Sequence, residues 1–239
     1  MFRNPLENLF PANASMEEMI MQILLIVIPF MLCITVHELA HGFTAYRLGD
    51  NTAKNQGRLT LNPVKHIDPF GLLMIVLFRF GWAKPVPVNM YTFKHPKRYM
   101  AVTAFAGPLS NIIFALIAML AFGFLYMPIV SLPPNISMFI QTLFIRIVEI
   151  NIMLAVFNML PIPPLDGSKI LFSLFSEESY FKLMRYERYG MFVLILLLNI
   201  PVFRDALSSA IGTLFDSFVP VWRTAFSLAN RRYILEIIS

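Results

Sequence analysis

Long apolar runs joined by short connections are the feature that most restricts how this chain can fold. Each run approaches the ~20 residues that a helix needs to cross a bilayer, and the runs cover 19–46, 99–127, 137–163, 187–203 and 206–222. Backbone polar groups in lipid must be satisfied within the protein, so spans of this kind are helical. The sequence therefore predicts a membrane all-α protein, a polytopic helical bundle of about five spanning helices.

A sixth apolar stretch, residues 71–82, is too short to cross the membrane. As a helix it would measure about 18 Å at ~1.5 Å per residue, whereas the hydrocarbon core is about 30 Å thick. We expect this stretch to be a re-entrant or interfacial segment.

Composition indicates one membrane-embedded unit. Apolar residues make up 57% of the chain and charged residues only 14%, whereas soluble domains carry about 25% charged residues. No polar stretch reaches the roughly 100 residues of a separate soluble domain, so residues 1–239 are expected to form a single membrane-embedded domain. Its motif-bearing core covers about 19–170, and further C-terminal helices are expected over about 187–203 and 206–228.

The basic residues predict the orientation of the chain. The 47–98 connection holds nine of the nineteen Lys and Arg residues, the 164–188 connection four, and the end from Arg223 three. The positive-inside rule therefore places the N-terminus outside and the 47–98 connection in the cytoplasm. Because these residues are spread over several connections, the formal net charge of +5 favours the lipid bilayer as partner and not nucleic acid.

The sequence HELAH at 37–41 has a metal-binding pattern within the first apolar run. His37 and His41 are one helical turn apart and project from one face, where both can bind the same zinc ion. Glu38 points to the open side of such a site and can accept a proton from metal-bound water. It is expected near the cytoplasmic edge of the membrane, about 27 Å along the helix from Ile20. The alternative, polar contacts between helices without a metal, is disfavoured because ionisable groups are costly in lipid.

A catalytic zinc takes three protein ligands, so one more must come from elsewhere in the chain. NMLPIPPLDG, residues 158–167, is the segment that we expect to supply it through Asp166. Its three prolines prevent a regular helix, and irregular backbone at that depth is tolerated where it lines a wet cavity. A plain helix-ending turn is the alternative.

Four segments, HELAHGF, GRLTLNPVKHIDPFG, GPLSN and NMLPIPPLDG, resemble the site-2 protease family of intramembrane zinc metalloproteases, and the match covers about residues 31–170. The resemblance implies a zinc metalloendopeptidase of regulated intramembrane proteolysis that hydrolyses transmembrane protein substrates within or near the bilayer. The expected location is a bacterial cell membrane, with the active site near the cytoplasmic face. The sequence lacks the PDZ and CBS domains of larger members and so resembles the minimal branch.

The same resemblance assigns roles to individual residues. It implies one zinc per chain, held by His37, His41 and Asp166, with Glu38 as the catalytic glutamate. Asn158 matches the family's asparagine eight residues before the aspartate, and we expect it to stabilise the oxyanion. A cap at the end of a helix is the alternative role for Asn158. Asn111, in GPLSN, falls where the family has a small or polar residue and joins the expected substrate-binding set.

Substrate binding is expected to involve a strand, because a helical peptide hides its carbonyl groups and must be extended before cleavage. GRLTLN alternates polar and apolar residues, which predicts a strand that pairs with substrate by β-augmentation. We expect a small β-hairpin near the active site. WAKPVPVN at 82–89 cannot be a central strand because of Pro85 and Pro87, but it can line an edge or gate. The residues of the expected substrate-binding strand are Gly57, Arg58, Leu59, Thr60, Leu61 and Asn62. A connection that only links the spans is the alternative.

Two other functions remain open at this point. A membrane zinc protease acting on prenylated or soluble termini would draw its third ligand from a downstream glutamate. A non-proteolytic zinc-binding adaptor or transporter would not need Glu38. Arg146 and Glu149, three residues apart in the 137–163 run, are interpreted as an internal ion pair facing other helices. The sequence does not predict the oligomeric state.

Overall fold

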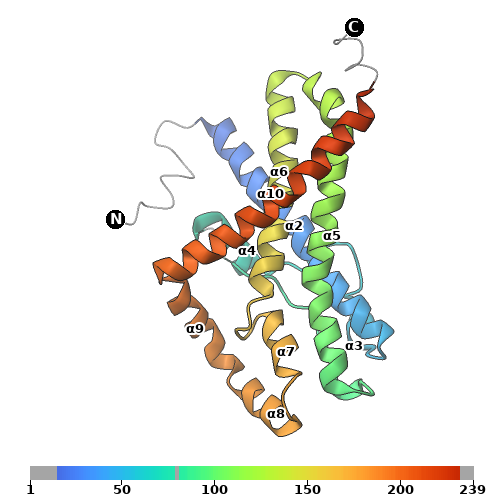
Figure 1. The fold of residues 1–239 in the computed structure, drawn as a ribbon, viewed down its shortest axis with the longest axis vertical. Coiled ribbons are helices and arrows are strands. Elements are labelled where there is room, and N and C mark those ends of the chain that lie inside the picture. Colours follow the sequence, from blue (N-terminus) through green and yellow to red (C-terminus); the bar gives the residue numbers. More distant parts are fainter. Residues whose placement is uncertain (1–14, 79–80, 232–239) are drawn as a thin grey trace.

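The computed structural model describes residues 15–78 and 81–231, and this part of the chain is dominated by helices (Figure 1). The four long helices are α2 (Met16–Arg47), α5 (Pro96–Val130), α6 (Pro134–Asn158) and α10 (Pro201–Ala229). The short α-helices are α3 (Thr52–Asn55), α4 (Pro69–Phe78), α7 (Asp166–Phe172), α8 (Glu177–Arg185) and α9 (Glu187–Leu198). Two 3₁₀ turns, η1 (Pro63–Lys65) and η2 (Met90–Thr92), lie in the connection between α2 and α5.

Three helices, α2, α5 and α6, are long and apolar enough to cross a membrane. Within residues 15–78 and 81–231, a fourth span exists only if α9 and α10, which are bent by 91° relative to each other, form one broken span. The expectation of a multi-pass helical membrane protein is thus confirmed, whereas the count of five spans is not. The 187–203 run is divided because a new helix begins at Pro201, which leaves α9 with 12 residues, about 18 Å.

The core lies where α2, α5 and α6 pack together, with α10 laid across α5 (Figure 1). Small buried side chains at the contact, among them Cys33, Ala115 and Ala118, let these helices approach closely. Phe122 and Tyr126 of α5 pack against the aromatic rings of Trp222 and Phe226 of α10. This packing fixes α5 and α6 beside the C-terminal half of α2, where the metal-binding pattern lies.

The ends of α2 follow from local capping. Ser15 and Glu18 form a capping box, because the Ser15 hydroxyl accepts from the Glu18 N–H and the Glu18 carboxylate accepts from the Ser15 N–H. The helix stops at Arg47, and Gly49 follows with a φ of 109°, in the region that favours glycine.

The predicted β-hairpin is wrong for the described residues. No strand is formed in this part of the chain, and Ile67 and Ala83 make an isolated bridge. Residues 59–61 form bends, because side chains there bond to nearby backbone: Thr60 Oγ1 accepts from the Asn62 N–H and Asn62 Oδ1 from the Val64 N–H. Across from them, Pro85 and Pro87 have no N–H to offer a ladder.

The short apolar stretch does form a helix too short to cross, as expected. α4 has 10 residues, about 15 Å, and is capped by Asp68, whose carboxylate accepts from the N–H groups of Phe70 and Gly71. Gly71 lies directly against the backbone of Trp82, so the segment doubles back after α4. This geometry is compatible with a re-entrant or interfacial position.

Candidate metal centre

α2 presents the two histidines of the predicted pattern on one buried face. His37 and His41 expose 3% and 9% of their surface, and their rings meet edge to face with centroids 4.6 Å apart. The two Nε2 atoms are 3.0 Å apart. A four-residue spacing on a helix produces this arrangement, as the sequence predicted.

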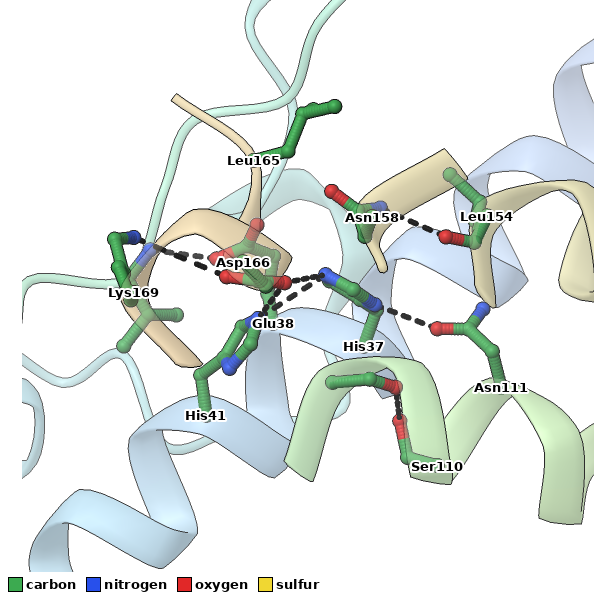
Figure 2. Close-up of polar contacts among 12 residues, drawn as sticks. His37, Glu38, His41, Ser110, Asn111, Leu154, Asn158, Leu165, Asp166 and Lys169 are labelled. Atoms are coloured by element: carbon green, nitrogen blue, oxygen red, sulfur yellow. Dashed lines mark hydrogen bonds and ion pairs between the residues drawn. The ribbon is translucent and has the colours of Figure 1, made fainter. Parts of the chain in front are cut away.

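Asp166 completes the group from the first residue of α7 (Figure 2). Its Oδ2 lies 3.3 Å from His37 Nε2 and 3.1 Å from His41 Nε2. The chain reaches this point through the non-helical turn after α6, where Gly167 packs against the carbonyls of Met159 and Leu160. The structure thus brings together the three residues predicted as ligands.

Hydrogen bonds on the far side of each imidazole fix its orientation. His37 Nδ1 lies 2.5 Å from Asn111 Oδ1, and His41 Nδ1 lies 2.7 Å from the Thr103 carbonyl oxygen. Both acceptors require a proton on Nδ1, which leaves the Nε2 lone pairs facing Asp166. Both partners belong to α5, and α5 comes this close because Gly107 lies against the two imidazoles.

The Asn111 amide is itself held by a second buried amide. Asn111 Nδ2 donates to Asn151 Oδ1 at 2.8 Å, and Asn151 Nδ2 donates to the Ile147 carbonyl and to Cys33 Sγ. Asn111 and Asn151 are fully buried. The sequence analysis did not identify Asn151; its signal was a lone amide within an apolar span. The substrate-binding role expected of Asn111 stays a prediction.

The residues present fit a zinc ion. Two Nε2 lone pairs and a carboxylate oxygen lie within 3.3 Å of one another, and Oδ2 of Asp166 is buried with no hydrogen-bond partner. Ligands at ~2.0–2.1 Å around a tetrahedral zinc are about 3.3 Å apart. Three acceptors gathered in this way repel one another unless a cation lies between them. Among the described residues no fourth His, Cys, Asp or Glu joins the group, which leaves a coordination position for water or substrate.

Glu38 is buried next to this group and is held by a backbone donor. Its Oε2 accepts a hydrogen bond from the Val86 N–H at 2.7 Å. Because Pro85 and Pro87 flank Val86, this is the one N–H that the tripeptide can donate. Neither Val86 nor its segment was identified from the sequence as a partner of Glu38.

The model of peptidase family M50 matches residues 25–200 of this chain. The chain belongs to peptidase family M50. Its resemblance to the site-2 proteases is thereby confirmed, and with it a zinc metalloprotease activity.

Two relatives of this M50 protein are also named as zinc metalloproteases. YwhC of Bacillus subtilis is 37% identical over 201 residues, which cover 84% of this chain and 92% of YwhC. Rip2 of Mycolicibacterium smegmatis is 26% identical over 198 residues, 81% of this chain and 73% of Rip2. Both carry the name "Putative zinc metalloprotease". No solved structure matches this chain.

Residues 57–62 of the M50 chain form no strand in this structure, and their contacts are with the neighbouring loop. The substrate-binding role expected of them stays a prediction. Arg58 is buried and donates to the carbonyl oxygens of Lys84 and Pro85, immediately before Val86. Leu61 is exposed, and Asn62 caps η1. The Thr60 carbonyl accepts from His66 Nε2, while the His66 carbonyl accepts from the Lys84 N–H. These residues hold the 84–89 segment against Glu38.

Asn158 lies at the last position of α6, half-buried. Its Nδ2 donates to the Leu154 carbonyl of the same helix at 2.9 Å (Figure 2). This contact caps the end of α6, which is the alternative role that the sequence suggested for Asn158. An oxyanion role for Asn158 stays a prediction.

Proposed function

We propose that this M50 metalloprotease hydrolyses peptide bonds within or near the membrane-spanning segments of other membrane proteins, close to the cytoplasmic face of the membrane. The observation that carries the proposal is the position of the metal centre. His37, Glu38 and His41 lie on α2, a helix long and apolar enough to span the membrane, and all three are buried. A site built into a spanning helix is accessible to substrates that are themselves in the bilayer.

When zinc is bound, it lowers the pKa of a water molecule and polarises the scissile carbonyl. Glu38 acts as the general base. Val86 occupies Oε2 of Glu38 with its N–H, which keeps Oε1 for the proton of the attacking water. The same carboxyl group then delivers that proton to the leaving amine.

Asn158 stabilises the negative charge that develops on the substrate carbonyl oxygen. An amide side chain has two N–H groups, and the contact with Leu154 uses one of them. The second N–H donates to the oxyanion while the first keeps the side chain oriented.

A substitution of Glu38 tests the proposal. The full chain in lipid nanodiscs is given a single-span reporter substrate, and zinc content and cleavage are measured in the same preparation. Glu38→Gln keeps the side-chain shape and does not touch the zinc ligands. We expect it to keep stoichiometric zinc and to lose cleavage by about 10²–10⁴-fold.

Glu17→Gln is the matched control, because it makes the same chemical change at an exposed position of the same helix. It should leave zinc and cleavage unchanged. Parent-level cleavage by Glu38→Gln would remove Glu38 from the mechanism. A parent that cuts soluble peptides but no membrane-spanning substrate would contradict the proposed substrate class.

A further inference from the structure

Arg146 and Glu149 form an ion pair at the middle of α6. Arg146 Nη1 donates to Glu149 Oε2 at 2.9 Å, which confirms the predicted pair. The expected location between helices is wrong, because the two side chains are 54% and 43% exposed. Arg146 is twelve residues from Pro134 and twelve from Asn158, the two ends of α6, so Arg146 lies about 18 Å from either end of this candidate span and Glu149 lies one turn further along. Charged groups at mid-depth are costly in lipid, so this pair requires a polar cover.

A cavity of about 640 Å³ opens beside Arg146, mainly between α2 and α6, with Ile75 of α4 and Leu198 of α9 also in its lining. Gln22, Thr142 and Arg146 line its polar part, and most of the remaining lining is apolar. Its lining also includes Leu154 and Phe157, and the Leu154 carbonyl is the atom that binds Asn158. The cavity therefore connects the uncovered ion pair with the end of α6 that carries the proposed catalytic asparagine.

We propose that this cavity docks a transmembrane helix of the substrate, and that the Arg146–Glu149 pair recognises a neutral amide side chain, Asn or Gln, on that helix. The inference rests on the proposed function and specifies its substrate class. The ion pair has no net charge, and it offers both guanidinium donors and carboxylate acceptors. An amide satisfies both groups at once and adds no charge to the membrane interior. A charged partner leaves a net charge in lipid, and an aliphatic partner leaves the pair uncovered.

The geometry of α6 sets the register of this amide. The distance from Arg146 to Asn158 is about 18 Å along the helix axis. A substrate that stays helical covers this distance in about twelve residues, and one whose last four residues are extended at ~3.3 Å each covers it in about seven. The amide is therefore expected about seven to twelve residues from the scissile bond. It lies on the part of the substrate that runs from the scissile bond toward the Pro134 end of α6.

The test measures binding, separately from cleavage. The probes are Leu-Ala transmembrane peptides with lysine flanks and a flexible Gly-Ser segment at one end, where cleavage is possible. One Gln is placed at successive distances from that segment, and a peptide with Leu in its place is the reference. Binding is measured by energy transfer to the zinc-loaded Glu38→Gln chain in nanodiscs. We expect Gln to strengthen binding at least fivefold within the seven-to-twelve window and to have no effect outside it.

Two variants of the Glu38→Gln chain locate the subsite. Arg146→Leu with Glu149→Leu removes both charges together, so no unpaired charge remains, and the advantage of Gln should disappear. Ile145→Ala, at an exposed neighbouring position of α6, should keep it. Because the Gln scan uses neither of these two variants, it decides the matter even where the double variant does not fold.

Equal binding of the Gln and Leu peptides would overturn the proposal. It would also be overturned if a phospholipid is retained by the parent and lost from the double variant while both peptides bind equally, since the pair would then hold a headgroup. Cleavage of a flexible peptide by the parent, dependent on zinc and Glu38, is measured alongside. If the parent cleaves the flexible peptide but binding shows no preference for Gln, the docking site alone is rejected. If the parent does not cleave the flexible peptide, the proposed chemistry is rejected.

Discussion

Two asparagine amides, Asn111 and Asn151, join His37 to the packed centre of the helices. Each is fully buried, and their hydrogen bonds run from His37 through α5 to α6. The amide of Asn151, the last in this series of hydrogen bonds, is oriented by the backbone carbonyl of Ile147, which cannot rotate as a side chain can. The orientation of a zinc ligand is therefore determined by residues two helices away.

This network makes zinc affinity sensitive to residues that are not ligands. Asn111→Ala removes the acceptor of the His37 Nδ1 proton, and we expect the Kd for zinc to rise about 10–100-fold. Asn151→Ala should weaken zinc binding less, because Asn111 keeps its bond to His37. Competition with a chelator measures both constants. Asn135→Ala, at the exposed start of α6, is the control. Unchanged affinity in both core variants would show that the imidazole is held by packing alone.

Asp166 is expected to contribute directly to metal retention. Asp166→Ala removes one of three protein ligands, so zinc occupancy and proteolysis should fall together. Metal analysis after dialysis and a cleavage assay on the same sample check this. Asp205→Ala removes an exposed carboxylate from α10 and should change neither. Tight, stoichiometric zinc in Asp166→Ala would mean that the third ligand lies elsewhere.

The sequence predicts this centre well at the level of ligands and poorly at the level of their supports. His37 and His41 are paired by helical spacing, and a proline-broken turn marks Asp166, so local patterns suffice. Thr103 binds His41 through its backbone carbonyl, an atom that every residue has, so its side chain gives no signal. Val86 reaches Glu38 from 48 positions away through an N–H, which residue type likewise does not reveal.

At the scale of elements, the connection between α2 and α5 acts as a support for Glu38. Arg58 holds the carbonyls before Val86, and Asp50 accepts from the Asn89 N–H at 2.6 Å on the other side. The alternation in 57–62 suggested a strand because sequence periodicity does not report competing side-chain bonds. A strand requires a partner with free N–H groups, and the proline-rich segment beside it has few. Because these N–H groups are missing, the connection is held by isolated contacts such as the Ile67–Ala83 bridge.

Asp50 gives this support a pH dependence. Burial acts to raise the pKa of Asp50, but hydrogen bonds from the Thr52 hydroxyl and from the N–H groups of Asn89 and Thr52 outweigh it and hold the pKa below the ordinary value of 3.8. The stabilisation is thus complete above that value and is lost as the pH falls through the lower pKa of the folded state.

We therefore expect Asp50→Asn to lower the free energy of unfolding at pH 7 by about 2 kcal/mol, the typical contribution of hydrogen bonds to a charged group. The difference between parent and variant should shrink as the pH falls below the ordinary value of 3.8. Thermal unfolding in mild detergent at several pH values measures it. Asp68→Asn, which changes a carboxylate that caps α4, is the control for a general effect of charge. A gap that stays constant with pH would contradict the role given to ionised Asp50.

At the scale of the whole molecule, three long helices form the frame and α10 packs against it. The sequence located the three spans because each is a continuous apolar run. It did not predict the bend between α9 and α10, because two apolar runs separated by a proline read equally well as two spans. The number of crossings therefore depends on geometry at Ile200 and Pro201, not on hydropathy.

Orientation in the membrane can be measured with a single thiol. Cys33 is the only cysteine of the chain and is buried, so Cys33→Ala with Leu61→Cys places one thiol at an exposed position of the α2–α5 connection. The positive-inside rule predicts that a membrane-impermeant maleimide labels it only after the cells are opened. Leu132→Cys in the same background, in the connection between α5 and α6, is the comparison and should label from outside. Labelling of Leu61→Cys in intact cells would reverse the proposed orientation.

Gly107 carries a genetic consequence of the close packing between α5 and α2. The imidazoles of His41 and His37 occupy the space that any side chain at this position would need. Gly107 takes no part in the chemistry, yet every replacement adds at least a methyl group where the two metal ligands lie. In a saturation screen scored by proteolysis, position 107 should therefore be as intolerant of substitution as positions 37 and 41. Second-site substitutions that restore activity should arise at other positions of α5, where they can shift that helix, and not at the two histidines.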